Sequence, residues 1–303
     1  MLKVAVVLVN YGQWELTRKC IDSLMRSEGV DIRVTLVDNH SEGEVPAWIN
    51  NCTGVRFERL NENTGFAGGN NIGFQISRND QAEFTLFLNN DALIAPGAIL
   101  KLAEFLVDNP EAGIVTPPVY YASDPERIWS AGGRFIPWKM RFDQKVYPSR
   151  NDLPAQAVKL DFASGCAMMI RTELFERTGG FRDDFFMYYE DADLCRKVSL
   201  AGYSIWLLPA EEVVHHVASG SGGELSPLAV YFSERNRLIL SRQMLASGMR
   251  AVFLIYISAV LIVKTFKFLI WQGPRLIPWI WKGYVSGLSG RTGYRTILKK
   301  MIG

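Results

Sequence analysis

The stretch Leu86-Phe87-Leu88-Asn89-Asn90-Asp91 joins an apolar run of strand length to a polar cluster that ends in a carboxylate. The apolar part begins at Phe84, and an uninterrupted run of this kind is typical of a strand that is covered on both faces of a parallel sheet. In open α/β sheets, ligands bind beyond the carboxyl ends of the strands. We therefore expect Asp91 to lie at a ligand-binding edge.

Three earlier segments repeat this design, with an apolar run followed by Asn or Asp. They are Lys3–Val9 before Asn10, Ile32–Val37 before Asp38, and Val55–Leu60 before Asn61. Helical spacing of apolar residues predicts a helix over Trp14–Ser27, and Pro96 begins another that runs to about Val107. The β-α-β-β-α-β-α order predicts an open, mostly parallel sheet flanked by helices. Asn and Asp are also common in turns, but four such strand ends together favour a ligand site.

The second half of the chain is less regular. We predict a strand over Leu160–Ile170 that carries Ser164-Gly165, and a helix over Asp191–Leu200 that ends before Gly202. Two short strands, Ser204–Leu208 and Val213–Val217, follow, and then a helix over Leu228–Leu245.

A Gly- and Asn-rich run, Gly65 to Gly73, separates the third and fourth strands. It lacks the Gly-Lys-Ser/Thr of a P-loop, and it does not follow the first strand as a dinucleotide fingerprint does. Its glycines would let backbone N–H groups approach a diphosphate closely. A tight turn before a helix explains them equally well.

Glu190-Asp191-Ala192-Asp193 places three carboxylates directly after the apolar run Phe185–Tyr189. A carboxylate against an apolar wall has a raised pKa, which suits a general base. The alternative is a helix N-terminus, where acidic residues offset the helix dipole. His215 and His216 follow, and neutral imidazole is a ligand for Mn²⁺-type ions, although a buried, hydrogen-bonded histidine remains the alternative.

Cysteine spacing and the N-terminus exclude several protein classes. The four cysteines, Cys20, Cys52, Cys166 and Cys195, form no CxxC pair, which argues against a zinc or redox motif and is consistent with reduced thiols in a cytosolic protein. The apolar run after Lys3 is too short for a signal peptide.

The formal net charge of +2 conceals an asymmetry. Residues 241–303 contain ten Lys or Arg and no Asp or Glu, whereas residues 1–240 carry 23 basic and 31 acidic residues, a net charge of −8. The basic part is also rich in apolar and aromatic residues, which favours an anionic membrane surface over nucleic acid as its partner. The apolar run Ala251–Val263 spans roughly 20 Å as a helix, less than a bilayer core of about 30 Å. We therefore predict interfacial helices, with a membrane span, an oligomer interface or a cap on the first domain as alternatives.

A series of short motifs runs in order along residues 3–240. They are Val9-Asn10-Tyr11, Val37-Asp38-Asn39-His40-Ser41, Asn63-Thr64-Gly65-Phe66-Ala67-Gly68-Gly69-Asn70-Asn71, Asn89-Asn90-Asp91, Ser164-Gly165, Gly179-Gly180-Phe181, Glu190-Asp191-Ala192-Asp193, and Pro209 with His215 six residues on. In this combination the chain resembles inverting family 2 glycosyltransferases of the GT-A fold, most closely their bacterial rhamnosyltransferase-like branch.

The resemblance implies a role for each motif. Asp191 would be the base that deprotonates the acceptor hydroxyl, and Asp38 would accept a hydrogen bond from the donor's nucleobase. Asp91 and His215 would contact a divalent cation, Mn²⁺ or Mg²⁺, with His216 replacing His215 if the register shifts by one. Asn89 stands where the family has the first acid of its Asp-x-Asp motif, which weakens the expected cation affinity. The implied donor-binding residues are Asn10, Asp38, Asn63, Gly65, Gly69, Asn70, Asn89, Asn90, Gly165 and Glu190.

The expected protein has a GT-A catalytic domain over residues 1–240 and a helical, membrane-associating region over residues 241–303. Rhamnose from dTDP-rhamnose is the expected donor sugar, and a lipid-linked saccharide or polysaccharide is the expected acceptor. Galactosyl, glucosyl or N-acetylhexosaminyl transfer, or a non-catalytic scaffold role in polysaccharide assembly, are the alternatives. The expected location is the bacterial cytoplasm, at the inner face of the cytoplasmic membrane. We expect no nucleic-acid partner, and an oligomer is possible.

Overall fold

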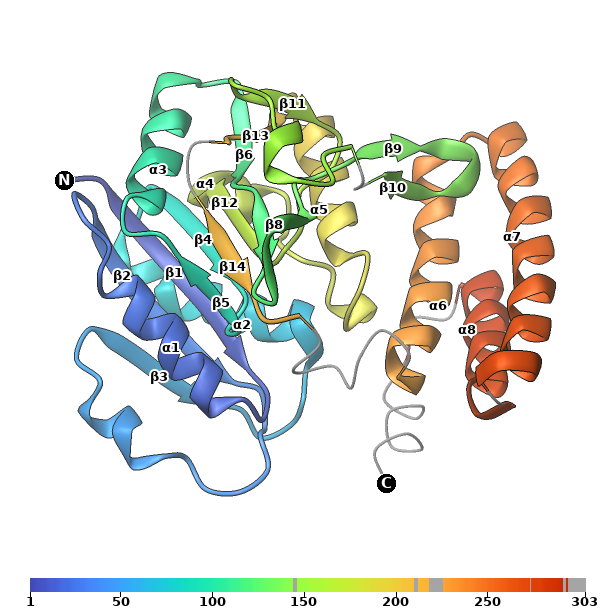
Figure 1. The fold of residues 1–303 in the computed structure, drawn as a ribbon, viewed down its shortest axis with the longest axis horizontal. Coiled ribbons are helices and arrows are strands. Elements are labelled where there is room, and N and C mark those ends of the chain that lie inside the picture. The colour runs from blue at the N-terminus through green and yellow to red at the C-terminus, as the bar shows by residue number, and fades with distance from the viewer. Residues whose placement is uncertain (144–145, 210–211, 218–225, 273, 291–292, 294–303) are drawn as a thin grey trace.

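The computed structural model describes residues 1–143, 146–209, 212–217, 226–272, 274–290 and 293. An eight-stranded sheet forms the centre, in the order β11-β13-β6-β12-β4-β1-β2-β3 (Figure 1). Its strands are β1 (Lys3–Asn10), β2 (Asp31–Asp38), β3 (Val55–Arg59), β4 (Phe84–Leu88), β6 (Ala112–Thr116), β11 (Val158–Leu160), β12 (Ala167–Arg171) and β13 (Ser204–Leu207). The predicted parallel sheet is confirmed for β1 to β4, whereas β12 runs antiparallel to β4 and β6, so that the complete sheet is mixed.

Alternate side chains of β1 enter two different cores. Val4, Val6 and Leu8 pack on the side of α1 and α3, and Val7 packs on the side of α2, α4 and α5. This burial on both faces explains why β1 reads as a continuous apolar run. The helices are α1 (Trp14–Leu24), α2 (Gly65–Ser77), α3 (Ala98–Asp108), α4 (Thr172–Arg177) and α5 (Glu190–Leu200).

A second, four-stranded sheet has the order β5-β14-β7-β8. Its strands are β5 (Ala92–Ile94), β7 (Val119–Tyr121), β8 (Asp124–Ser130) and β14 (Val213–His215). His215 is the residue opposite Ala92 in the antiparallel β5–β14 pair. This register brings His215 next to Asp91, far away in the sequence.

The predicted single strand over Leu160–Ile170 is wrong. β11 pairs with β13 at the edge of the sheet, and β12 lies between β4 and β6. Because two other strands separate β11 from β12, the chain must leave the sheet between them, and Ser164-Gly165 lies in that connection. The Gly-rich run lies within a helix, because Gly65 begins α2.

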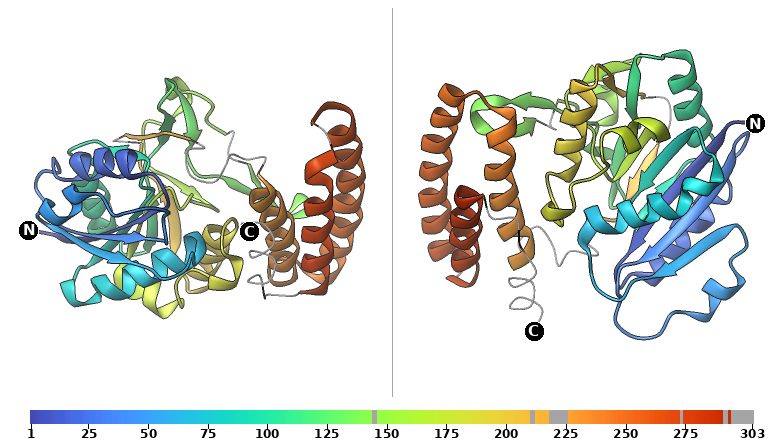
Figure 2. Two further views of the ribbon diagram at one scale, coloured as in Figure 1. Left: turned by 90° about the horizontal axis from the view of Figure 1, so that it is seen from below. Right: turned by 180° about the vertical axis from the view of Figure 1, so that it is seen from behind.

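Among the described residues, three helices follow the α/β part: α6 (Pro227–Met244), α7 (Ser247–Lys267) and α8 (Ile277–Ser289). Figures 1 and 2 show them together at one end of the molecule, reached by the hairpin of β9 (Arg134–Ile136) and β10 (Arg141–Asp143). Helices α6 and α7 run in opposite directions (Figure 2), and α8 packs closely on α6, where a Cβ on Gly283 would stand 2.5 Å from the carbonyl oxygen of Tyr231. The boundary expected at residue 240 falls inside α6, so this helix belongs to both parts of the chain.

Candidate active site

Asn10, at the end of β1, is completely buried and connects neighbouring strand ends. Its Nδ2 donates to Asp38 Oδ1 and to Ser41 Oγ, both at 3.1 Å. Its Oδ1 accepts hydrogen bonds from Thr17 Oγ1 at 2.9 Å and from Asn90 Nδ2 at 3.3 Å. The amide of Asn10 therefore holds the polar edge of the sheet together.

Asp38 is also completely buried, and both of its carboxylate oxygens have partners. Oδ1 accepts from the hydroxyl of Ser41, and Oδ2 lies 3.3 Å from Nε of Arg59. The Arg59 guanidinium also donates to the carbonyl oxygens of Ser41 (2.7 Å) and Gly43 (2.9 Å). Arg59 was not among the predicted site residues, although its position at the end of the third predicted strand could have indicated a role there.

Asn39 and Asn63 shape the start of α2. Asn39 Nδ2 donates to Asn63 Oδ1 and to the carbonyl of Gly65, each at 3.0 Å. Asn39 Oδ1 accepts from Thr64 N at 2.8 Å, and Asn63 Oδ1 accepts from Gly65 N at 2.8 Å. Asn70 is buried one turn further on and donates to the carbonyl of Phe66.

The glycines of α2 allow the helix to lie very close to β1. A Cβ on Gly69 would stand 2.8 Å from Val9 Cγ1, and one on Gly73 would stand 2.5 Å from Val7 Cγ1. Gly65 has a φ of +76° and faces the carbonyl of Phe186. Close packing thus accounts for these three glycines, independently of any diphosphate.

Asp91 and His215 meet at the junction of the two sheets. His215 Nε2 lies 2.9 Å from Asp91 Oδ1 and 3.3 Å from Asn89 Nδ2. Both side chains are largely buried, and Trp129 packs its ring against the imidazole with centroids 4.6 Å apart. Asn90 turns away from this pair and donates to Thr17 Oγ1 at 2.9 Å.

The structure brings together a carboxylate and an imidazole, as a cation site needs. Within the described residues, however, no group of three or more His, Cys, Asp or Glu side chains converges on one point. A site built on Asp91 and His215 would therefore take its remaining ligands from phosphate and water oxygens, which is the usual situation for Mg²⁺ at a nucleotide.

Asp191, in the first turn of α5, accepts hydrogen bonds from two backbone N–H groups. Gly165 N donates to Oδ2 at 3.3 Å, and Ala192 N donates to Oδ1 at 2.8 Å. Burial outweighs these bonds and raises the pKa of Asp191 to about 6. Burial, and then the charge of Asp191, raise the pKa of Glu190 well above its usual range. Glu190 Oε2 is a buried oxygen without a hydrogen-bond partner within the described part of the chain.

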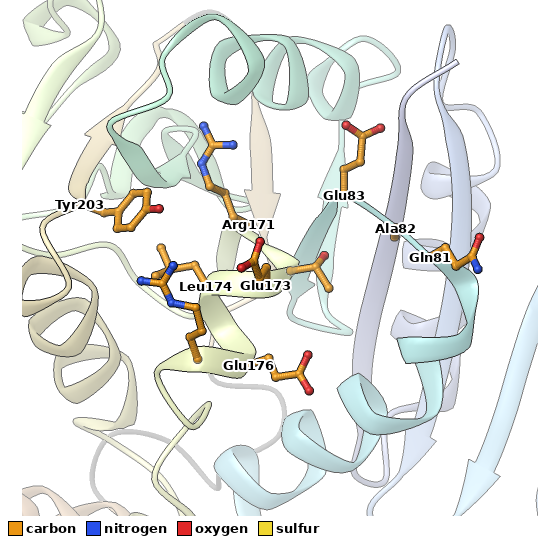
Figure 3. A pocket seen from close by; sticks show the side chains of 10 residues that line it. Gln81, Ala82, Glu83, Arg171, Glu173, Leu174, Glu176 and Tyr203 are labelled. Carbon is orange, nitrogen blue, oxygen red and sulfur yellow. The ribbon is translucent and has the colours of Figure 1, made fainter.

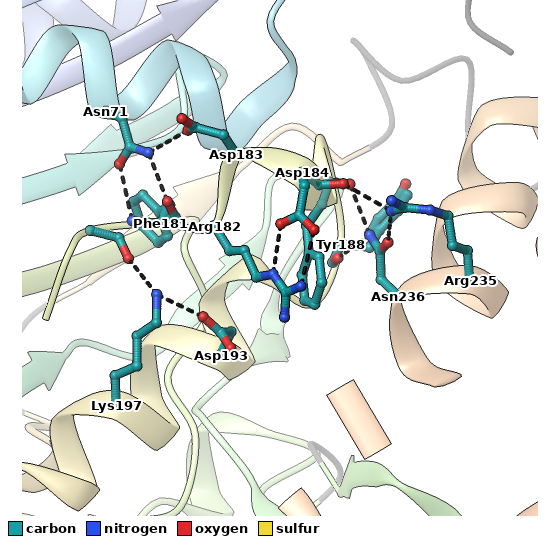
Figure 4. A network of polar contacts seen from close by, with 12 residues as sticks. Asn71, Phe181, Arg182, Asp183, Asp184, Tyr188, Asp193, Lys197, Arg235 and Asn236 are labelled. Atoms are coloured by element: carbon teal, nitrogen blue, oxygen red, sulfur yellow. Dashed lines mark hydrogen bonds and ion pairs between the residues drawn. The ribbon is translucent and has the colours of Figure 1, made fainter. Parts of the chain in front are cut away.

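Asp193, the third acid of the cluster, has a structural role. Its Oδ2 lies 2.8 Å from Lys197 Nζ, which also donates to the carbonyl of Gly180 (Figure 4). All three acids lie in the first turn of α5, as the helix-N-terminus alternative requires, but the Asp191 carboxylate also accepts a hydrogen bond from Gly165, outside the helix.

The loop before Asp191 is held from α6. Phe186, Tyr188 and Tyr189 all have positive φ, between 63° and 71°, a backbone region that bulky residues rarely adopt. Asn236 Nδ2 donates to the carbonyls of Phe185, Met187 and Tyr188, at 2.8 to 2.9 Å (Figure 4).

Arg235 adds a further contact of α6, because its Nη1 donates to Asp184 O at 2.9 Å. Both Arg235 and Asn236 are completely buried. We did not assign them to the site from sequence, although a run of polar residues between the apolar ends of one predicted helix was a usable signal.

Gly165 and Cys166 connect the two halves of the site. Asn89 N donates to the carbonyl of Cys166 at 2.8 Å, and Gly165 N donates to Asp191. Two adjacent residues thus contact both the Asn89–Asp91 turn and the candidate base. Sequence alone placed them in a strand and gave no such connection.

A separate pocket of ≈ 460 Å³ lies at the opposite edge of the sheet (Figure 3). Its lining includes Glu83, directly before β4, and Arg171, at the end of β12. The Arg171 guanidinium is occupied by the carbonyls of Leu106, Asn109 and Ala112. None of the predicted site residues lines this pocket, so it is not the candidate active site.

The layered sheet and its acidic edge define a GT-A-like protein, and solved structures agree on the fold. The chain resembles S. aureus TarS 1–349 in complex with UDP-GlcNAc with a TM-score of 0.63 and 14% identity, over 95% of this chain and 81% of that one. GalNAc-T7 with UDP, GalNAc and Mn²⁺ gives a TM-score of 0.61 at 15% identity, over 78% of this chain and 47% of that one.

Sequence relatives narrow the class. The profile of glycosyl transferase family 2 matches residues 5–179, and the chain belongs to this family. It is a glycosyltransferase. The low-salt glycan biosynthesis hexosyltransferase Agl10 of Haloferax volcanii is 25% identical over 96% of this chain and 92% of its own length. The N-acetylglucosaminyl-diphospho-decaprenol L-rhamnosyltransferase of Mycobacterium tuberculosis is 26% identical, over 72% of this chain and 77% of its own length. The dTDP-rhamnosyl transferase RfbF of Shigella flexneri is also 26% identical, over 77% and 80%.

Proposed function

We propose that this protein transfers a sugar, with rhamnose from dTDP-rhamnose as the first candidate, to a hydroxyl of a lipid-linked saccharide with inversion at the anomeric carbon. The proposal rests mainly on the environment of the Asp191 carboxylate. This carboxylate has a pKa of about 6 and is oriented by the same short segment that contacts the Asn89–Asp91 turn. A base of that pKa is ionised at neutral pH and still accepts a proton effectively.

The reaction is a single displacement. The acceptor oxygen attacks the anomeric carbon, its proton passes to Asp191, and the bond from that carbon to the diphosphate oxygen breaks. The nucleoside diphosphate leaves with the electron pair of the broken bond. Gly165 N–H keeps Asp191 directed during this step.

A divalent cation fits the proposed site, since Asp91 and His215 supply one carboxylate and one imidazole close together. Mn²⁺ or Mg²⁺ held there would offset the negative charge that builds up on the departing diphosphate. The Mn²⁺ named with GalNAc-T7 supports a cation on this fold.

The donor and acceptor are proposed from the relatives. Two of them are named as rhamnosyl transferases, and one name specifies a diphospho-decaprenol acceptor. Transfer of galactose, glucose or N-acetylhexosamine is the alternative within the class, because Agl10 is named only as a hexosyltransferase.

Thermal unfolding with a panel of donors tests the proposal: dTDP-rhamnose, UDP-glucose, UDP-galactose, UDP-N-acetylglucosamine and GDP-mannose, each with and without Mn²⁺. A donor at 100 times its Kd adds about 2.7 kcal/mol to the free energy of unfolding. We expect a shift with dTDP-rhamnose only when Mn²⁺ is present. A shift with another donor would replace rhamnose, and no shift with any donor would favour a scaffold role.

We further propose that α7 lies on the inner face of the cytoplasmic membrane. The helical segment Ser247–Trp271 is long and apolar enough to cross a bilayer, and only 22% of its most apolar window is buried. Phe253, Ile257 and Leu261 form its protein-facing stripe, and Lys264 pairs with Glu234 of α6. A spanning orientation would carry α6 and this ion pair into hydrocarbon, whereas an in-plane helix leaves them at the surface.

Vesicle binding tests this orientation. Ile255 and Phe266 are 75% and 61% exposed on α7, and Leu200 is a comparably exposed apolar residue of α5. Ile255→Glu with Phe266→Glu should abolish co-sedimentation with phosphatidylglycerol vesicles, while Leu200→Glu should retain it. Equal binding by all variants would contradict the docking of α7.

A further inference from the structure

A pocket of ≈ 290 Å³ lies between α6, α7 and β10, with Tyr189 in its lining. Arg141 of β10, Arg237 of α6 and Lys264 of α7 all line it, together with Tyr189, Tyr256 and one carboxylate, Glu234. Three cationic groups against one carboxylate make the pocket a site for an anion.

The buried positive charge of Arg237 is the clearest indication that this pocket binds an anion. This side chain is only 9% exposed. Its guanidinium donates to the carbonyls of Lys139 and Met140 and packs against the rings of Phe253 and Tyr256. Within the described residues no carboxylate pairs with it. A largely buried cation of this kind gains most from a bound anion.

Lys264 and Arg141 complete the positive wall in different ways. Lys264 is paired with the buried Glu234, so its charge is partly used within the protein. Arg141 is exposed on the hairpin, with its guanidinium available to a ligand that enters from solvent or membrane. The fork of Arg matches phosphate oxygens in a way that Lys does not.

The pocket also adjoins the base. Tyr189, in its lining, immediately precedes Glu190 and Asp191. Burial raises the pKa of the Tyr189 phenol, with Arg237, Arg141 and Asp191 all close enough to influence it. A molecule bound through an anionic group in the pocket would therefore hold its next chemical unit near Asp191.

Two residues of α7, Tyr256 and Val260, give the pocket an apolar part beside Lys264. Ile255, Val263 and Phe266 of the same helix are all more than 60% exposed. The pocket is at the small end of the 300–1,000 Å³ usual for ligand sites, which suits a head group but not a whole lipid. The ligand that fits has an anionic head and an apolar tail.

We propose that this pocket binds the phosphate or diphosphate of the lipid that carries the acceptor sugar, with the lipid chain lying along α7. The inference rests on the proposed transfer to a lipid-linked acceptor and assigns the residues that would recognise that lipid. Arg237 and Arg141 bind the phosphate oxygens, and the acceptor sugar extends past Tyr189 toward Asp191.

Binding of farnesyl diphosphate to the full chain, measured by calorimetry in EDTA, tests the proposal without any sugar transfer. We expect farnesyl diphosphate to bind at least about tenfold more tightly than farnesol or inorganic diphosphate, since neither has both parts of the ligand. Arg141→Gln should weaken binding about tenfold, because it removes an Arg–phosphate contact at an exposed residue. Arg134→Gln, on the other strand of the same hairpin and outside the pocket, should not.

Equal binding by wild type and Arg141→Gln would overturn the proposal, as would equal binding of farnesol and farnesyl diphosphate. Loss of phosphatidylglycerol-vesicle binding in Arg141→Gln, with farnesyl diphosphate binding kept, would also overturn it in favour of a membrane-phospholipid site. These results are independent of the transferase assignment. A protein that binds farnesyl diphosphate here and yet transfers no sugar would refute the proposed function and leave the pocket assigned.

Discussion

His215 Nε2 lies 2.9 Å from Asp91 Oδ1, although one residue follows β4 and the other ends β14. The antiparallel β5–β14 pairing produces this contact, since it sets His215 opposite Ala92. His216, the alternative ligand, donates its backbone N–H to the carbonyl of Asp91 instead. The structure thus favours His215 over His216 as the partner of the Asp91 carboxylate.

Removing either Asp91 or His215 should weaken the affinity of the site for a divalent cation. Asp91→Asn and His215→Ala are each expected to raise the Mn²⁺ concentration for half-maximal transfer by tenfold or more, as changes around metal ligands commonly do. Titration of the initial rate with Mn²⁺ measures this. Asp31→Asn, at the opposite end of β2 from the site, is the control. An unchanged Mn²⁺ requirement in both variants would remove Asp91 and His215 from the cation site.

The pKa of Asp191 predicts how transfer depends on pH. A base works in its ionised form, and burial raises the pKa of this carboxyl to about 6. We therefore expect kcat/KM to be constant above that pH and to fall about tenfold per unit below it. Donor-induced thermal stabilisation over the same range separates loss of ionisation from unfolding. A profile that stays level down to pH 5 would contradict the assignment of Asp191 as base.

Replacement of the base should separate catalysis from binding. Asp191→Asn keeps the shape of the side chain but cannot take the acceptor proton, so we expect turnover to fall by about two to four orders of magnitude. The Kd for the donor, measured by thermal shift, should stay within about twofold, because the proton-transfer step is not needed for binding. Near wild-type turnover would refute the role of Asp191.

The sequence was sufficient for the elements whose signals are local. Continuous apolar runs predicted β1 to β4 almost to the residue, and the Asn and Asp residues at the ends of β1 and β2 and after β4 do form one connected polar edge. Contacts between segments that are distant in the chain could not be predicted from the sequence. The run Leu160–Ile170 is apolar throughout most of its length, but its two ends pair with different strands of the sheet.

The role of the α2 glycines also depended on tertiary structure. Pattern alone left a phosphate-binding loop and a turn before a helix equally open, and only the distance to Val7 and Val9 shows close helix–sheet packing. Asn236 was hidden for the same reason, because its three acceptors lie about fifty residues earlier in the chain.

Asn236 should control the base through the loop that precedes it. Asn236→Ala removes the amide group that the three carbonyls share, and each of its two N–H groups contributes about 1 kcal/mol. We expect kcat to fall at least about tenfold while donor Kd is nearly unchanged, because Asp191 loses its position without leaving the site. Hydrogen exchange of residues 183–191 should accelerate in parallel.

Asn109→Ala provides the matched control for Asn236. Asn109 also donates its amide to a backbone carbonyl, that of Phe105, but it lies at the end of α3 away from the site. This variant should retain kcat. If both variants lost stability equally and kept kcat, Asn236 would be a structural residue only.

The close approach of α2 to β1 predicts a large difference between two Gly→Ala substitutions. A Cβ at Gly73 would stand 2.5 Å from Val7 Cγ1 and 3.2 Å from Val37 Cγ2, both on buried strands, so Gly73→Ala forces the helix outward. Overpacking of this kind costs about 1–3 kcal/mol of unfolding free energy. Gly248, in the first turn of α7, has nothing within 4 Å of its Cβ position, so that Gly248→Ala should be neutral or stabilise by up to about 1 kcal/mol. Urea unfolding of both variants measures the difference.

Because α2 also carries Gly65 against Phe186, Gly73→Ala should weaken donor binding as well. A Gly73→Ala protein that is as stable as wild type would show that close packing is not the reason for glycine at this position.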